Sequence, residues 1–423
     1  MILSGAIPPK AMKAKYKLAL ALIAISVFIN LIYQPLPDGF QQPWKYRLIC
    51  FGSDLLGLFG RFVELIGLYH RLNVTRLAYH LTIGAFSMRD PNDRIQVTDE
   101  FIEHVPIRVY RPMNRLTSHE ELLPTIIFFH GGGFFLGSAD TLEPVTYLLA
   151  NQTNCLVVYI EYRLIPEYKY PAQLTDSWLA TLYLIKHSLD YKIDLDRLIL
   201  MGDSAGGNLA TVIGNRLIEE EIARPKMQVL IYPILQFFDF TLPSYRINLP
   251  KRVLGNIGYE NFKNFIHYYT EIEVDDSIFQ NGHTSREHKE GFLAQHVNPG
   301  FLPYHFRDGL NHLPVLNDTN NKYAKLNEIL LSPRVSPLLV TDEFLISYTP
   351  EYTYLLTTEL DILRDDGFIY AERLRKLGIE IQHEHYDKLF HGVLGLLHGP
   401  LQFEVATELI KNVSRSINSV IYN

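Results

Sequence analysis

A serine in a five-residue glycine motif is the first residue whose type and spacing could do chemistry. Residues 202–206 read Gly-Asp-Ser-Ala-Gly, with Ser204 at the centre, between an apolar run at 198–201 and a helical pattern over 208–217. In a tight turn from a strand into a helix, small neighbours leave a serine hydroxyl open to attack a carbonyl. The GxSxG spacing also occurs by chance and at the start of ordinary helices. Whether Ser204 is a nucleophile therefore depends on whether the chain carries the other groups that such a site needs.

A glycine run after an earlier apolar segment offers a second catalytic part. Residues 125–129 are typical of a buried parallel strand, and residues 130–133 read His-Gly-Gly-Gly. Successive glycines let the backbone turn its N–H groups toward a reacting oxygen, as an oxyanion hole requires. We expect the amides of Gly131 and Gly132, with that of Ala205, to be these donors; the alternative is a flexible loop.

An acid is expected C-terminal to the serine. Enzymes that carry their serine in a strand-to-helix turn of this kind have the catalytic triad in the chain order Ser, Asp or Glu, then His. A strand pattern at 352–357 is followed by Asp361, which we predict to be the acid, with Glu359 as a weaker competitor. Asp365 and Asp366 lie just before the next predicted helix, where carboxylates are common as N-caps, so we predict a structural role for both.

The histidine follows a further strand. Residues 379–386 alternate apolar and polar side chains, and the loop after them carries His391, the predicted general base. The chain has 16 histidines, so most of them are structural or superficial. His383 and His385 are two residues apart on the alternating strand and are predicted to face outward together.

These co-linear motifs resemble the hormone-sensitive-lipase branch of the α/β-hydrolases, and within it the arylacetamide deacetylase-like membrane esterases. The resemblance covers most of the chain and rests on residues 130–134 (HGGGF), 162–167 (YRLIPE), 202–208 (GDSAGGN), 242–245 (LPSY), 361–367 (DILRDDG) and 390–392 (FHG). It implies the nucleophile Ser204, the acid Asp361, the base His391 and an oxyanion segment from His130 to Gly132. Ile165 and Asp366 stand where the family often has alanine and glutamate.

The resemblance also implies an activity. We expect the hydrolysis of lipophilic acyl esters, with arylacetamides as a second substrate class. The reaction would proceed through an acyl-enzyme and would require no metal or organic cofactor. One alternative is a binding or receptor-type homologue without turnover, which the presence of a complete triad disfavours. The other is a serine peptidase on the same fold.

Composition fits such an enzyme. The 423 residues are 47% hydrophobic, enough for a large core with an added cap, and the net charge of -7 offers no basic surface for nucleic acid. Strand-like runs alternate with helical stretches, which predicts an α/β-hydrolase fold with a mostly parallel sheet and helices on both faces. Cap elements are expected at about 40–100 and 237–331.

The N-terminus predicts a membrane segment. A basic tail, residues 1–17, precedes an apolar run at 18–34 that Pro35 and Pro37 follow. We interpret the run as an uncleaved signal anchor with the tail cytoplasmic and residues 35–423 in the lumen of the endoplasmic reticulum, a single-pass type II arrangement. The alternative is signal cleavage and secretion. Sequons that luminal residence would make usable are at Asn73, Asn151, Asn317 and Asn412.

Two further features leave alternatives open. Cys50 and Cys155 are the only cysteines, so one disulfide is possible in the lumen, although Cys155 opens a strand where a buried thiol is expected. Residues 48–68 are predicted to form an amphipathic helix that caps the site or rests on the membrane, or else a plain core helix. Aromatic residues of the second cap segment could line an acyl pocket or pack inside the cap: Phe237, Phe238, Tyr259, Phe265, Tyr268 and Tyr269.

Overall fold

The computed structural model describes residues 35–85, 87–90, 92, 94–113, 122–251, 258–307 and 321–422, with the single residues 17, 22, 26, 29 and 33. The predicted tail and signal anchor therefore lie almost entirely outside the described residues, as does Asn317. Along the described stretches, no helix has the length and apolar character needed to span a bilayer.

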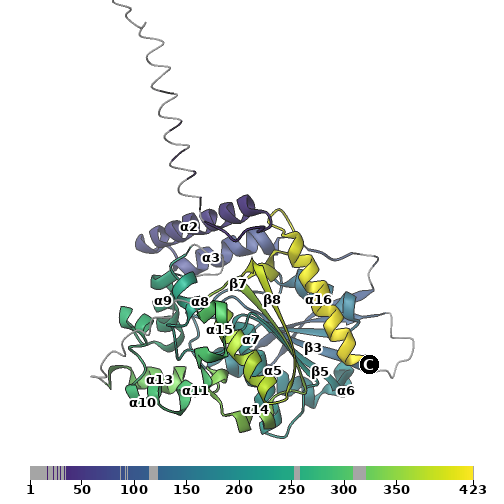
Figure 1. The fold of residues 1–423 in the computed structure, drawn as a ribbon. Coiled ribbons are helices and arrows are strands. Elements are labelled where there is room, and N and C mark those ends of the chain that lie inside the picture. The colour runs from purple at the N-terminus through teal and green to yellow at the C-terminus, as the bar shows by residue number, and fades with distance from the viewer. Residues whose placement is uncertain are drawn as a thin grey trace, which may run out of the picture.

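An eight-stranded sheet lies at the centre of the molecule (Figure 1). Its order is β1-β2-β4-β3-β5-β6-β7-β8; β2 runs antiparallel to β1 and β4, and the strands from β4 to β8 run parallel. The strands are β1 (Ile95–Ile102), β2 (Val105–Pro112), β3 (Leu123–Phe129), β4 (Leu156–Ile160), β5 (Ile193–Asp203), β6 (Met227–Ile231), β7 (Tyr352–Leu360) and β8 (Glu380–Phe390). The prediction of a mostly parallel sheet flanked by helices is confirmed, and β1 begins inside the predicted cap segment 40–100.

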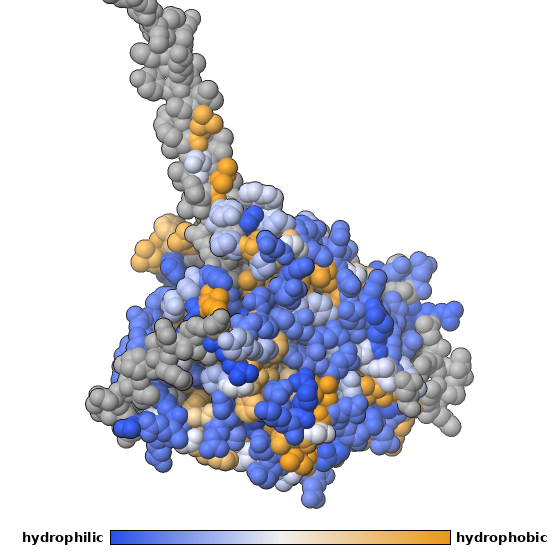
Figure 2. Space-filling model, viewed as in Figure 1, coloured by the Kyte–Doolittle hydropathy of each residue, from blue (hydrophilic) through white to orange (hydrophobic). Residues whose placement is uncertain are grey.

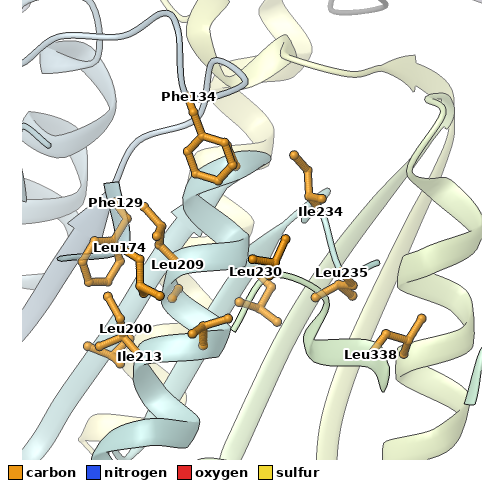
Figure 3. Packing of buried hydrophobic residues seen from close by; sticks show 14 of the residues in the cluster. Phe129, Phe134, Leu174, Leu200, Leu209, Ile213, Leu230, Ile234, Leu235 and Leu338 are labelled. Atoms are coloured by element: carbon orange, nitrogen blue, oxygen red, sulfur yellow. The ribbon is translucent and has the colours of Figure 1, made fainter. Parts of the chain in front are cut away.

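Helices cover both faces of this sheet. They are α4 (Glu143–Thr153) and α16 (Glu404–Ile421) on one face, and α5 (Ala172–Lys186), α7 (Ala205–Glu219), α14 (Asp342–Tyr348) and α15 (Arg364–Lys376) on the other. Because successive strand residues point to opposite faces, Leu200 of β5 packs toward α7 while Ile199 and Met201 pack toward α4 and α16. Figure 3 shows Phe129, Leu200 and Leu230 meeting Leu209 and Ile213 of α7. These layers hold the carboxyl ends of the parallel strands together.

The remaining helices form a cap at those carboxyl ends, with short connections elsewhere. They are α2 (Pro43–Leu65), α3 (Arg71–Tyr79), η1 (His80–Gly84), α6 (Ser188–Tyr191), α8 (Pro243–Asn248), α9 (Gly258–Thr270), η2 (Asp276–Gln280), α10 (Arg286–Glu290), α11 (Phe292–His296), η3 (Pro299–Phe301), α12 (Tyr304–Arg307), η4 (Asn321–Tyr323), α13 (Ala324–Leu330), η5 (Pro337–Leu339) and η6 (Val393–Leu396). In Figure 1, α2 and α3 lie across the top of the sheet beside α9 and α8.

The structure decides between two pairs of alternatives that the sequence left open. No disulfide joins Cys50 and Cys155: both are buried thiols packed among apolar side chains, Cys50 on the inner side of α2 and Cys155 just before β4. The helix predicted at 48–68 is α2, and it is not a core helix, because its buried residues are only Tyr46, Cys50, Gly60 and Val63.

Candidate active site

Ser204 lies in the turn between β5 and α7, in a conformation that few residues adopt. Its φ is 53° and its ψ is −116°, and its amide donates to the carbonyl of Ile231 at 2.9 Å. The turn is tight: a Cβ atom added to Gly206 would lie 1.9 Å from the carbonyl oxygen of Phe129. Such backbone strain persists only where the surroundings impose it, and here the neighbouring strands do so. The glycine spacing of the motif is thus a steric requirement.

Three side chains from separate loops form a hydrogen-bonded chain. His391, after β8, places Nε2 2.9 Å from Ser204 Oγ and Nδ1 2.9 Å from Asp361 Oδ2. Because a carboxylate only accepts, Nδ1 carries the imidazole proton and Nε2 accepts from the hydroxyl. Asp361, after β7, also accepts from the Leu363 amide at 2.8 Å. This is the geometry of a nucleophile, a base and an orienting acid.

The electrostatics of His391 favour its charged form. Burial lowers the pKa of the imidazole, but the charge and hydrogen bond of Asp361 and the nearby charge of Asp203 outweigh burial, and the pKa is raised above 6.5. A histidine with this setting stabilises the proton that it receives from a serine.

The loop that carries Asp361 is supported by residues whose role the sequence reasoning missed. Asn248 of α8 donates to the carbonyl of Asp361 at 2.9 Å, and the Ser244 hydroxyl donates to that of Ile362 at 2.7 Å. Glu359, the weaker candidate, instead accepts from Arg364 at 2.8 Å and lies 3.4 Å from His385. The structure therefore brings Asp361, and not Glu359, to the histidine.

The prediction that Asp365 and Asp366 lie at the N-cap of the helix is wrong, although both have a structural role. Both lie inside the first turn of α15 and are completely buried. Asp365 accepts from Arg364 and from the Ser244 amide, and Asp366 accepts from Gln236 at 2.9 Å. They join α15 to the start of the cap because buried carboxylates need donors from the neighbouring segments.

The oxyanion assignment needs one correction. The Gly131 amide donates to Asp203 Oδ1 at 2.7 Å, so it is not available to a substrate oxygen. Within the described chain, the amides of Gly132, Gly133 and Ala205 make no hydrogen bond, and Gly132 and Gly133 line the same cavity as Ser204. Burial raises the pKa of Asp203 to about 6, against the opposing effects of the Gly131 amide and His391. Asp203 thus fastens the glycine loop to the serine turn.

His130 has a packing role. Its ring is buried between Tyr159 and Tyr162, with centroids 5.4 and 4.0 Å away, and its Nδ1 lies 2.8 Å from the Gly131 carbonyl. Burial lowers the pKa of His130 to about 4, which keeps the ring neutral. His130 therefore orders the loop backbone rather than meeting a substrate.

A cavity of about 1070 Å³ opens onto Ser204 and His391. Residues of α2, α3 and α9 line it together with the glycine loop. Of the six aromatic residues proposed for it, Phe237, Phe265 and Tyr268 line the cavity, whereas Phe238, Tyr259 and Tyr269 do not. The guanidinium of Arg76 on α3 binds the carbonyls of Phe135 and Ile165 and the carboxylate of Glu167, which ties the cap to the glycine loop.

The prediction that His383 and His385 face outward to solvent is wrong. They share one side of β8, but both approach the buried Thr357 hydroxyl, at 2.9 and 3.0 Å, and pack against Phe368. Burial lowers the pKa of His383 to about 3. The helix α15 covers this side of the strand, which strand alternation alone does not reveal.

The described sequons differ in their surroundings. Asn151 is exposed on α4, Asn73 accepts from Arg76 at 3.0 Å, and Asn412 donates to the Tyr386 hydroxyl at 3.0 Å. Among the residues given a place in the structure, no group of three His, Cys, Asp or Glu side chains could hold a metal ion.

Comparison with known proteins extends these observations. Residues 126–280 match a family model described as an alpha/beta hydrolase fold. Neutral cholesterol ester hydrolase 1 of Pongo abelii is 32% identical over 93% of this chain and 96% of that protein. Arylacetamide deacetylase of Bos taurus is 32% identical over 90% of this chain and 94% of that protein. A fungal esterase structure from Rhizomucor miehei shares the fold, with a TM-score of 0.61 and 21% identity over 82% of this chain and 90% of that chain.

Proposed function

The chain belongs to the α/β-hydrolase family that includes neutral cholesterol ester hydrolase 1 and arylacetamide deacetylase, as a carboxylesterase-type serine hydrolase, and we propose that it cleaves lipophilic acyl esters. Arylacetamides are the second substrate class in this proposal. The observation that carries it is the chain of two 2.9 Å contacts from Ser204 through His391 to Asp361, beside a cavity of about 1070 Å³.

The proposed mechanism uses each group in turn. His391 Nε2 removes the proton from Ser204 Oγ as the oxygen attacks the ester carbonyl carbon, and Asp361 stabilises the imidazolium. The amides of Gly132, Gly133 and Ala205 bind the oxyanion. The alcohol, or the amine of an amide, leaves with the proton from Nε2. Water then gives a proton to Nε2 and attacks the acyl-serine carbonyl carbon, and Nε2 returns that proton to Ser204 Oγ as the carboxylic acid is released.

The lipophilic substrate class is supported by the cavity and by the relatives. The cavity has room for a large acyl or alcohol group, since ligand pockets commonly measure about 300–1,000 Å³. Its lining includes Leu48, Leu56, Phe237 and Phe265. One relative is named as a hydrolase of cholesterol esters and another as a deacetylase of arylacetamides.

Replacement of the nucleophile tests the proposal. Ser204→Ala should lose fluorophosphonate labelling and ester turnover while keeping the wild-type melting temperature, because the small side chain fits the turn. Ser188→Ala, in α6, is the matched control and should label normally. Ordinary turnover by Ser204→Ala would refute the mechanism. A panel of esters with increasing acyl length, set against an arylacetamide, tests the substrate class, and a preference for charged, water-soluble esters would contradict it.

The cellular setting is also a proposal. The apolar run at 18–34 and its preceding lysines support a signal anchor with the catalytic domain in the lumen of the endoplasmic reticulum. Protease protection in microsomes should preserve residues 35–423, and a size shift with an endoglycosidase should depend on the exposed Asn151. An N-terminus beginning after residue 34 would favour cleavage and secretion instead.

A further inference from the structure

Helix α2 exposes an apolar stripe along its outer face. Trp44, Leu48, Leu55, Phe59 and Phe62 follow at intervals of four, seven, four and three residues, which places them on one side of the helix. With Leu58 and Leu65 they form what we call the α2 stripe, in which every side chain is at least 50% exposed. Figure 2 shows apolar atoms gathered at the end of the molecule where α2 lies in Figure 1. Soluble surfaces rarely carry so continuous an apolar face.

The stripe borders the mouth of the catalytic cavity. Leu48 belongs to the stripe and also lines the cavity, and its neighbours Gly52 and Ser53 are both exposed and cavity-lining. The stripe and the cavity lining therefore meet on α2 at Leu48.

The N-terminal end of the stripe has the composition of a membrane interface. The guanidinium of Arg47 lies 5.1 Å from the ring centroid of Trp44 and 4.8 Å from that of Tyr33. Trp, Tyr and Arg side chains favour the headgroup level of a bilayer, where an apolar body and a polar tip are both satisfied. The apolar run at 18–34 ends next to this cluster in the sequence, so the chain that enters α2 is itself suited to lipid.

Among the charged side chains of α2, Glu64 has partners on the neighbouring helix, whereas Asp54 and Arg61 are exposed on the same helix as the stripe. Glu64 lies to one side of it and contacts His70 at 3.3 Å and Arg71 at 3.7 Å. The helix thus presents its apolar side chains outward and compensates this carboxylate from α3.

We propose that the α2 stripe docks on the surface of a lipid bilayer, with α2 lying in the interface and the cavity mouth facing the lipid. A bilayer is the occupant because the stripe is continuous with the lipid-compatible N-terminal run, carries interfacial side chains and adjoins an apolar cavity. This docking goes beyond the proposed hydrolysis and does not depend on turnover.

Fluorescence quenching tests the docking directly, using the full chain in vesicles of phosphatidylcholine. The chain has two tryptophans, of which Trp178 is 7% exposed and serves as a constant background. A reporter is placed by Phe62→Trp in a Trp44→Phe chain, about 27 Å along the helix from position 44. That distance separates docking of α2 from mere proximity of the N-terminal run. Leu189→Trp in the same background is the control, because Leu189 is exposed on α6 at the opposite end of the molecule.

Docking predicts that lipids brominated near the headgroup quench the Phe62→Trp reporter at least twofold more than the Leu189→Trp reporter. Equal quenching of the two reporters in vesicle-bound protein would overturn the proposal, and so would a failure of the protein to float with vesicles.

A second experiment measures access to lipid-dissolved substrate. The variant Leu58→Glu/Phe59→Glu/Phe62→Glu changes side chains that do not line the cavity. Turnover of a long-chain ester dissolved in vesicles should fall about tenfold or more, while turnover of a monodisperse short-chain ester stays within about twofold of wild type. Leu189→Glu/Ile346→Glu, at exposed apolar sites on α6 and α14, should leave both activities unchanged. Unchanged turnover of the vesicle ester by the α2 variant would refute the docking surface.

Discussion

At the scale of single residues, two carboxylates act on His391 in different ways. Asp361 binds the imidazole directly, whereas Asp203 binds the Gly131 amide and acts on the imidazole only through its charge. The negative charges of both carboxylates raise the pKa of His391. Because Asp203 also binds the Gly131 amide, one side chain affects both the protonation of the base and the position of the glycine loop. The dependence of activity on pH therefore tests these contacts.

The pH dependence of activity follows from the direction of this shift. His391 acts as a base only when Nε2 is unprotonated, and its pKa is raised above 6.5. We therefore expect kcat/KM for a neutral ester to fall as the pH is lowered, with the midpoint of the acid limb above pH 6.5. A pH profile measured with an ester that does not ionise checks this. A midpoint well below 6.5 would contradict the described electrostatics.

Asp203 is predicted to be a positioning residue. Asp203→Asn keeps an oxygen for the Gly131 amide but removes the negative charge, so the acid limb should move to lower pH with a modest loss of kcat. Asp203→Ala removes the acceptor as well, and kcat should fall about tenfold further because the oxyanion loop is no longer fixed. Pre-steady-state and steady-state rates over the same pH range distinguish the two effects. Equal profiles for Asn and wild type would show that the charge does not act on His391.

At the scale of elements, polar contacts join the cap to the catalytic loops. Arg76 of α3 donates to the Phe135 carbonyl at 2.8 Å and to the Ile165 carbonyl at 2.6 Å, and pairs with Glu167 at 2.7 Å. A planar guanidinium reaches all three because its donors diverge from one centre. Arg76 thus holds α3 against the loop that supplies the proposed oxyanion donors.

Loss of this residue should loosen the cap. Arg76→Ala leaves two carbonyls and a carboxylate without their donor, so we expect the free energy of unfolding to fall by about 1–3 kcal/mol. KM for a long-chain ester should rise more than kcat falls. Denaturant titration and steady-state kinetics measure the two effects. Arg286→Ala, which removes an exposed pair with Glu290, is the control and should change stability by at most about 0.5 kcal/mol. Identical behaviour of the two variants would argue against the connection.

At the scale of the whole molecule, the sheet separates two cores. The face covered by α4 and α16 also packs the inner side of α2, so this cap helix is partly held by the same core as the final helix. Cys50 and Cys155 both belong to that core as thiols. Their stabilising contribution is apolar packing and not a covalent link between cap and sheet.

Thiol chemistry can check this arrangement. Without reductant, two thiols should react with an alkylating agent in denaturant, and reaction of the native protein should be much slower because both side chains are at most 5% exposed. The melting temperature should not change on addition of a reductant. Mass spectrometry counts the added groups. Recovery of unalkylated cysteines in denaturant that become reactive only after reduction would reveal a disulfide.

The predicted site shows what sequence order can provide. Ser204, Asp361 and His391 are predictable because each follows a strand pattern in the order that the α/β-hydrolase architecture requires. In the structure, His391 lies 2.9 Å from Ser204 Oγ and 2.9 Å from Asp361 Oδ2. Asp203 stood inside the same motif without a predicted role, because its partner Gly131 is 72 residues away. Arg76 had no signal at all: an arginine on a helix is ordinarily a solvated side chain.

By itself, the sequence determined the parallel strands from β3 to β8, the serine turn and the nature of the catalytic groups, since these depend on local sterics and hydrophobic periodicity, whereas the antiparallel strands β1 and β2 were not predicted. Only the tertiary structure decided which amide of residues 131–133 is already occupied, that Asp365 and Asp366 are internal rather than capping, and that His383 and His385 are covered by α15. It also decided that α2 turns an apolar stripe outward beside the cavity mouth. Such facts depend on contacts between segments distant in the chain, and no local pattern encodes them.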